Sequence, residues 1–120
     1  MFIKQISVFI ENRHGRLEEF TTLLGENGID LIALSIADTT NFGILRAIVA
    51  DNEKALRLVR DHGYTANLTE VLAVAVPDSP GGLAGVLTML RDGSISIEYL
   101  YSFVRRVGKD AIIIFRVDQP

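Results

Sequence analysis

The chain contains no cysteine and no tryptophan, and it has only two histidines among its 120 residues. Without cysteine there is no disulfide, iron–sulfur cluster, thiolate zinc site or cysteine nucleophile. Two histidines leave little for a histidine-based metal site, so we expect neither a metal nor a cofactor. The sequence also lacks a nucleophile elbow, an HExxH motif, a P-loop and a dinucleotide fingerprint. We therefore do not expect an enzyme.

Strong charge and long apolar runs are missing as well. The formal net charge is only −3, whereas a nucleic-acid surface needs clustered Lys and Arg. No apolar run reaches the roughly 18 residues that span a bilayer. The alternating segment 1–10 is typical of a strand and not of a signal peptide. We expect a cytoplasmic protein that binds neither nucleic acid nor membrane.

One pattern occurs twice along the chain. HGRL at 14–17 and PGGL at 80–83 each follow an apolar, strand-like run and each open a segment with helical periodicity. Each predicted helix ends near a glycine, Gly28 or Gly93, that we expect to be left-handed. An extended segment, a polar turn and a very apolar strand then follow in both copies. Five elements in the same order at a nearly constant offset indicate an internal duplication.

The first copy continues beyond these five elements. Asp51 or Asn52 is suited to cap a further helix that runs to about His62, and a last strand follows near 66–70. His62 is interpreted as a structural residue of this helix end. The element order is then β-α-β-β-α-β, which is the ferredoxin-like unit. The second copy reaches only β-α-β-β.

The predicted fold class is therefore α+β, with two ferredoxin-like units in tandem. The units comprise residues 1–70 and 71–120, and the second lacks its last helix and strand. No breaker residue interrupts 66–76, so the last strand of the first unit can run directly into the first strand of the second. Copper-carrier and RNA-binding versions of this topology need a CxxC motif or a basic aromatic face, neither of which is present.

Two segments, VFIENRHGRL at 8–17 and VAVPDSPGGL at 74–83, resemble ACT domains. Both have a strand, a polar Asn or Asp, a Pro-Gly-like turn and then a Leu on the first helix. NFGILRAIVAD at 41–51 and IEYLYSF at 97–103 are similar to stand-alone tandem ACT proteins. The resemblance implies a non-catalytic regulatory protein that binds an amino acid, at a place where the two units or two chains meet.

The chemistry of the two turns fits such a ligand. A helix N-terminus beside a glycine offers free N–H groups and a favourable dipole to a carboxylate. Asn12 and Asp78 could accept hydrogen bonds from the ammonium group. Alternatively, Asn12 or Ser79 only caps a helix and the glycines serve the turn. The candidate ligand-binding residues are Asn12, His14, Gly15, Arg16, Leu17, Asp78, Ser79, Gly81, Gly82, Leu83, Tyr99 and Tyr101.

Four of these candidates carry further expectations. His14 either bonds the ligand carboxylate, senses pH or is a solvated turn residue. Tyr99 and Tyr101 alternate with Ile97, so we expect them to face the helix, either as core or as a pocket wall. Gly81 is expected to have helical backbone angles, so that a side chain there would block the ligand but would hardly affect folding.

The incomplete second copy leads us to expect that two copies of the chain associate. With only one helix, its apolar strand at 112–117 should remain partly uncovered, and its first strand should lack a neighbour. Exposed apolar strand edges associate, so we expect a homodimer. The alternative function is a structural dimerisation module with a vestigial pocket.

Overall fold

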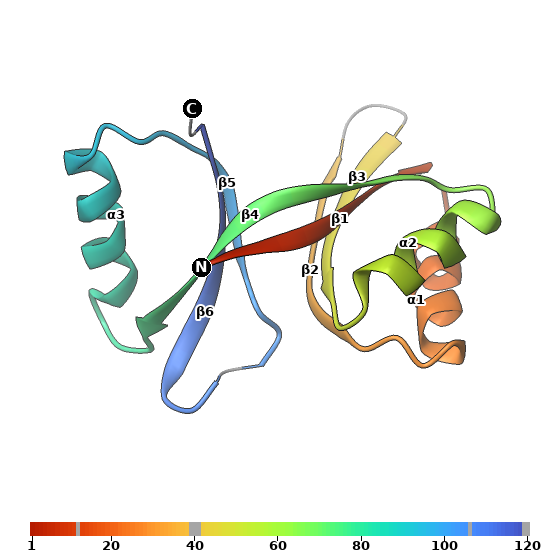
Figure 1. The fold of residues 1–120 in the computed structure, drawn as a ribbon, viewed down its shortest axis with the longest axis horizontal. Helices are drawn as coiled ribbons and strands as arrows, with labels where there is room; N and C mark the ends of the chain where they lie inside the picture. Colours follow the sequence, from red (N-terminus) through yellow and green to blue (C-terminus); the bar gives the residue numbers. More distant parts are fainter. Residues whose placement is uncertain (12, 39–41, 106, 119–120) are drawn as a thin grey trace. The chain divides into compact units, whose positions relative to one another are not determined.

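The computed structural model describes residues 1–11, 13–38, 42–105 and 107–118. Two compact units are present, a first unit of Lys4–Thr69 and a second unit of Met1–Ile3 with Glu70–Pro120. The strands and helices alternate as a duplicated α+β fold requires, which confirms the predicted fold class. In chain order the elements are β1 (Phe2–Glu11), α1 (Arg16–Glu26), β2 (Leu31–Asp38), β3 (Phe42–Val49), α2 (Asn52–Asp61), β4 (Thr65–Pro77), α3 (Gly82–Asp92), β5 (Ile97–Ser102) and β6 (Asp110–Val117) (Figure 1).

The first unit is a complete ferredoxin-like fold with the strand order β2-β3-β1-β4. β3 pairs antiparallel with both β1 and β2. Alternate residues of β1 and β3 point to α1 and α2, and the core that they form is aliphatic apart from the rings of Phe20 and Tyr64. Its members include Ile6, Val8, Ile10, Phe20, Leu24, Leu45, Ala47, Val49, Ala55, Val59 and Tyr64.

The second unit repeats this order with β4, β6 and β5, and its single helix α3 packs on β4 and β6. Four residues of α3 at helical spacing contact the buried Val76, Ile113 and Phe115. No residue of α3 is fully buried, whereas α1 buries two and α2 buries two. One helix alone thus covers its strands less completely. The four residues of α3 are Leu83, Val86, Leu87 and Leu90.

One expectation about the second unit is wrong. Its first strand does not lack a neighbour, because the backbone oxygen of Met1 accepts a hydrogen bond from the N–H of Ala73 at 2.8 Å. Its last strand is partly uncovered, since Ile113, Ile114 and Phe115 are buried whereas Ile112 and Val117 are only half-buried. The argument for a homodimer therefore loses the unpaired strand edge and keeps only part of the exposed apolar area.

Most predicted helix ends are confirmed. The carboxylate of Asp51 accepts a hydrogen bond from the N–H of Lys54 and caps α2, and Gly28 after α1 is left-handed with φ of 69°. Gly93 is not left-handed, because the next residue, Ser94, takes this conformation with φ of 57°. β4 is one strand of 13 residues, as the uninterrupted sequence at 66–76 predicted. Among the described helices, none has the length and apolarity needed to cross a membrane.

Both units contain the same irregularity in strand pairing. The β2–β3 register shifts between Leu31 and Ala33, and the β5–β6 register shifts between Ile97 and Tyr99. One extra residue at such a bulge reverses the face on which all later side chains lie. The bulge at Ile97 therefore decides where the tyrosines of β5 point.

Candidate functional site

The turns before α1 and α3 have one backbone conformation. Gly15 has φ of 86° and ψ of −8°, and Gly81 has φ of 86° and ψ of −6°. This left-handed region strongly favours glycine. The helical angles expected for Gly81 are therefore wrong, and a side chain there would strain the backbone.

The backbone hydrogen bonds of the two turns also match. The N–H of Arg13 donates to the oxygen of Glu11, and the N–H of Ser79 donates in the same way to the oxygen of Pro77. Two further backbone hydrogen bonds recur in both copies. In one, the N–H of the first helical residue donates to the oxygen three residues earlier. In the other, the N–H four residues beyond the glycine donates to the oxygen of the glycine. Among the described residues, no side chain caps α1 or α3. Ser79 is thus not a cap, while Asn12 lies outside the described residues.

Beside the first turn lies a groove of about 720 Å³, which we call the Gly15 groove. Every residue that lines it belongs to the first unit. Of the predicted site residues it brings together His14, Gly15 and Leu17. Its other lining residues, Arg13, Glu18, Thr21 and Leu34, escaped prediction. Arg13 and Thr21 were detectable, since one lies within the predicted turn and the other lies one helical turn beyond Leu17.

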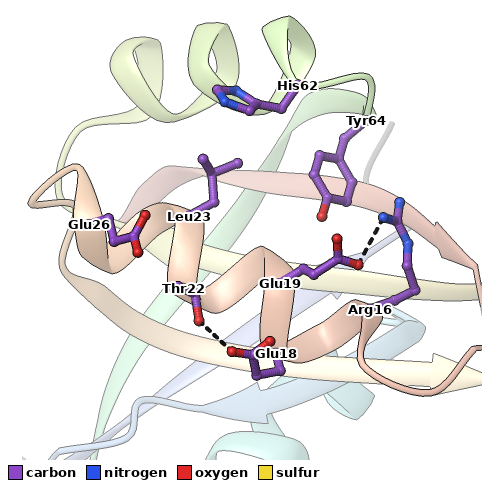
Figure 2. Close-up of a pocket in the computed structure, with 8 residues that line it drawn as sticks. All are labelled: Arg16, Glu18, Glu19, Thr22, Leu23, Glu26, His62 and Tyr64. Carbon is purple, nitrogen blue, oxygen red and sulfur yellow. Dashed lines mark hydrogen bonds and ion pairs between the residues drawn. The ribbon is translucent and has the colours of Figure 1, made fainter.

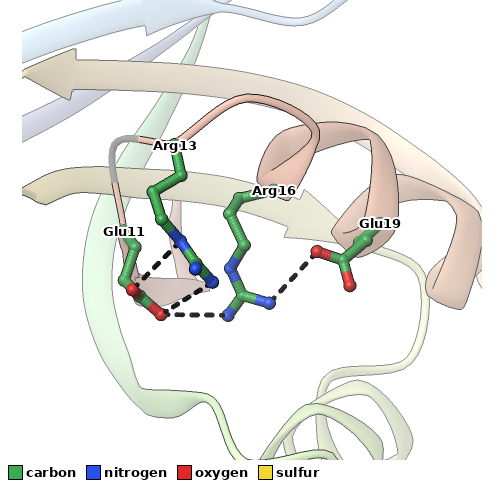
Figure 3. A network of polar contacts seen from close by, with 4 residues as sticks. All are labelled: Glu11, Arg13, Arg16 and Glu19. Atoms are coloured by element: carbon green, nitrogen blue, oxygen red, sulfur yellow. Dashed lines mark hydrogen bonds and ion pairs between the residues drawn. The ribbon is translucent and has the colours of Figure 1, made fainter.

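Arg13 and Glu11 form a forked ion pair at the edge of this groove (Figure 3). Nε of Arg13 lies 3.2 Å from Oε2 of Glu11, and Nη2 lies 3.5 Å from Oε1. The Arg13 side chain is 64% exposed. Exposed pairs of this kind contribute little free energy and exchange partners readily.

Arg16 does not line the Gly15 groove. Its guanidinium stacks 5.0 Å from the ring centroid of Tyr64, and its Nη1 lies 3.2 Å from a carboxylate oxygen of Glu19. Nε of Arg16 is buried and has no hydrogen-bond partner among the described residues. Figure 2 shows Arg16, Glu19 and Tyr64 in a second groove of about 410 Å³, which also contains His62. Among the candidate residues, Arg16 thus lines a different groove from His14 and Gly15.

His62 agrees with its structural interpretation. Its Nδ1 lies 2.9 Å from the backbone oxygen of Leu58 at the end of α2. A donated hydrogen bond from the ring satisfies one of the free carbonyls of the last turn.

The second turn differs from the first in its side chains. Leu83 packs into the core of the second unit, whereas its counterpart Leu17 is 39% exposed. A Cβ atom on Gly82 would overlap the backbone oxygen of Pro77, so this position excludes any side chain. A Cβ atom on Gly81 would meet nothing within 4 Å. The N–H of Asp78 donates to the oxygen of Lys109 at 3.4 Å, which ties this turn to the loop before β6.

Tyr99 and Tyr101 do not face α3, contrary to expectation. They pair across the ladder with Arg116 and Ile114, whereas the residues of β6 that pack against α3 are at the alternate positions. Cross-strand partners share one face of a sheet. The two rings therefore lie on the face away from α3, with centroids 6.5 Å apart. They are not part of a wall around Gly81.

Comparisons with known proteins give one family. A family model described as an ACT domain pair matches residues 1–120. A crystal structure of a protein from Bacteroides thetaiotaomicron is 41% identical, with a TM-score of 0.90, and the match covers 99% of this chain and 81% of that one. No curated protein matches significantly.

The regulatory subunit of aspartate kinase from Thermus thermophilus, in a ligand-free form, shares the fold. Its TM-score is 0.67 at 16% identity, over 93% of this chain and 80% of that one. The same subunit from Thermus flavus has a TM-score of 0.64 at 15% identity, over 96% and 84%.

Proposed function

Because the chain belongs to the ACT domain pair family, we propose that it is a non-catalytic regulatory protein that binds an amino acid in the Gly15 groove. The observation that supports this site most directly is the turn itself. Gly15 is left-handed, and the space where its side chain would lie is open. A ligand carboxylate can therefore approach the first N–H groups of α1, which have no acceptor within the helix.

The charges around the groove suit the two ends of an amino acid. Arg13 and His14 lie on the side of the turn and can bond a carboxylate, Arg13 by exchanging it for that of Glu11. Glu18, on the first turn of α1, can accept from an ammonium group. The second turn has Ser79 where the first has Arg13, so we assign the ligand to the first copy.

Regulation is proposed by analogy with the structural relatives, two of which are regulatory subunits of aspartate kinase. A cytoplasmic location and a homodimer also remain proposals. Light scattering at micromolar concentration tests the homodimer, and a mass of about 13.2 kDa would contradict it.

The test of ligand binding is a thermal-shift screen with the twenty amino acids. A ligand at 100 times its Kd stabilises the folded state by about 2.7 kcal/mol, which raises the Tm by several degrees. Arg13→Gln should lower the affinity roughly tenfold, as the loss of one charge-assisted contact implies.

The matched control is Ser79→Ala, which changes the equivalent position of the second turn. This variant should bind as the unmodified protein does. If no amino acid raises the Tm, the chain is better described as a structural dimerisation module. If Ser79→Ala weakens binding and Arg13→Gln does not, the ligand belongs to the second turn.

A further inference from the structure

One wall of the Gly15 groove is apolar. Leu17 lies on the first turn of α1 with 39% of its surface exposed, and Leu34 faces it from β2 as a half-buried residue. The counterpart of Leu17 in the second unit, Leu83, is packed into a core. Leu17 thus leaves apolar surface open beside the turn that is suited to a carboxylate.

Thr21 contributes apolar surface to the Gly15 groove and not a free hydroxyl group. Its hydroxyl oxygen lies 3.1 Å from the backbone oxygens of both Leu17 and Glu18, one helical turn earlier. The hydroxyl hydrogen is therefore used within the helix. The side chain of Thr21 offers the groove its methyl group, which continues the surface formed by Leu17 and Leu34.

The groove is also lined by polar groups. Arg13 and His14 precede Gly15, and the carboxylate of Glu18 accepts a hydrogen bond from Thr22 Oγ1 at 3.0 Å. A ligand with a carboxylate and an ammonium on one carbon can use these groups. Its side chain can then cover Leu17 and Leu34, which are the two large apolar side chains among the described residues that line the groove.

We infer that the Gly15 groove selects amino acids with an aliphatic or aromatic side chain. This inference rests on the proposed function and names the ligand class of the same site. A ligand with an apolar side chain binds more tightly because that side chain covers Leu17 and Leu34. Each methylene that is buried in this way should raise the affinity about fourfold. A charged or amide side chain of equal size instead loses its hydrogen bonds to water without gaining a polar partner on Leu17 or Leu34. A groove of about 720 Å³ has room for an aromatic ring.

Isothermal titration with alanine, 2-aminobutyrate and norvaline tests the inference, because these ligands differ by one methylene at a time. Each step should tighten binding about fourfold. Leucine should bind at least tenfold more tightly than asparagine, whose side chain has the same number of heavy atoms in the same branched arrangement. The variant Leu17→Gln should flatten the series, so that 2-aminobutyrate and norvaline gain little affinity over alanine.

The control variant is Met89→Gln, on α3 of the second unit. Met89 is 73% exposed and lines no part of the Gly15 groove, so this variant should keep the full series. Equal affinities along the series, or an equal loss for every ligand in Leu17→Gln, would overturn the selectivity and leave amino-acid binding intact. If none of these ligands and none of the twenty amino acids binds, the proposed function fails and the inference fails with it.

Discussion

The turns at 11–17 and 77–83 share a backbone and differ in almost every side chain. Both have a left-handed glycine and the same backbone hydrogen bonds. The first turn carries two arginines and an exposed leucine, whereas the second carries Ser79, Gly82 and a packed leucine. The conformation is thus set by one glycine in each copy, and the chemistry is set by the residues around it. A repeated motif therefore predicts two similar turns without predicting two similar sites.

The largest effect is expected from Gly82→Ala, because the new Cβ would overlap the oxygen of Pro77. The start of α3 must shift to relieve this contact. Overpacking of this kind costs about 2–3 kcal/mol, which lowers the Tm by roughly 10 °C. Arg16→Ala is the matched variant, since Arg16 already has a Cβ at the equivalent position, and it should cost only the contacts with Tyr64 and Glu19, about 1 kcal/mol. Calorimetry that gives Gly82→Ala an unchanged Tm would contradict the role assigned to this glycine.

The glycines of PGGL show which features of this turn can be predicted from the sequence and which cannot. The motif correctly predicted a turn and a helix start. It did not show that Gly81 is needed for its positive φ while Gly82 is needed for the approach of Pro77. The two requirements look alike in a sequence, because both are met only by glycine. Backbone angles and distances between segments are needed to tell them apart.

The tyrosines of β5 show a second limit. Strict alternation places Tyr99 on the same face as Ile97, and this rule fails because the register shifts between them. A bulge adds one residue to one strand and has no clear signature in composition. The Gly15 groove shows a third limit, since Leu34 joins it from a strand that folds back beside α1. Element order, the continuous β4 and the Asp51 cap were predictable because each depends on local sequence.

Gly15→Ala and Gly81→Ala form a pair of equal substitutions. Neither new Cβ meets an atom within 4 Å, and both residues have φ of 86°. The only cost is the left-handed backbone, about 1–2 kcal/mol in each case. Urea unfolding should therefore give two free energies of unfolding that agree to within about 0.5 kcal/mol. A large difference between them would show that the turns are less alike than their angles.

The second turn has Gly82 where the first has Arg16, so it has no equivalent side chain. Replacing Arg16 should have a moderate effect on the free energy of unfolding. Arg16→Gln loses the stacking on Tyr64 and the ion pair with Glu19, together worth about 1 kcal/mol. Arg16→Lys should lose nearly as much, since an ammonium cannot stack as a planar guanidinium does. Arg91→Gln is the control, because that side chain is 76% exposed and, among the described residues, forms an ion pair only with its neighbour Asp92. Urea unfolding in which Arg16→Gln matches Arg91→Gln would contradict this role.

The smallest effect on stability, and the sharpest on the site, is expected from Glu11→Gln. The carboxylate of Glu11 pairs with Arg13, the residue proposed to bind the ligand carboxylate (Figure 3). The same carboxylate lies 3.9 Å from Nη2 of Arg16. Removing its charge should change the free energy of unfolding by less than about 0.5 kcal/mol, because the Glu11 side chain is 46% exposed and the contact with Arg16 is long.

The same change should raise the affinity for the amino acid about two- to fivefold, since Arg13 no longer exchanges one carboxylate for another. The gain should shrink as salt screens the pair. Glu98→Gln serves as the control, because Glu98 pairs with Arg116 in the second unit at 3.8 Å and should leave binding unchanged. If titration shows that Arg13→Gln weakens binding while Glu11→Gln leaves it unchanged, Arg13 contacts the ligand but Glu11 does not compete with it.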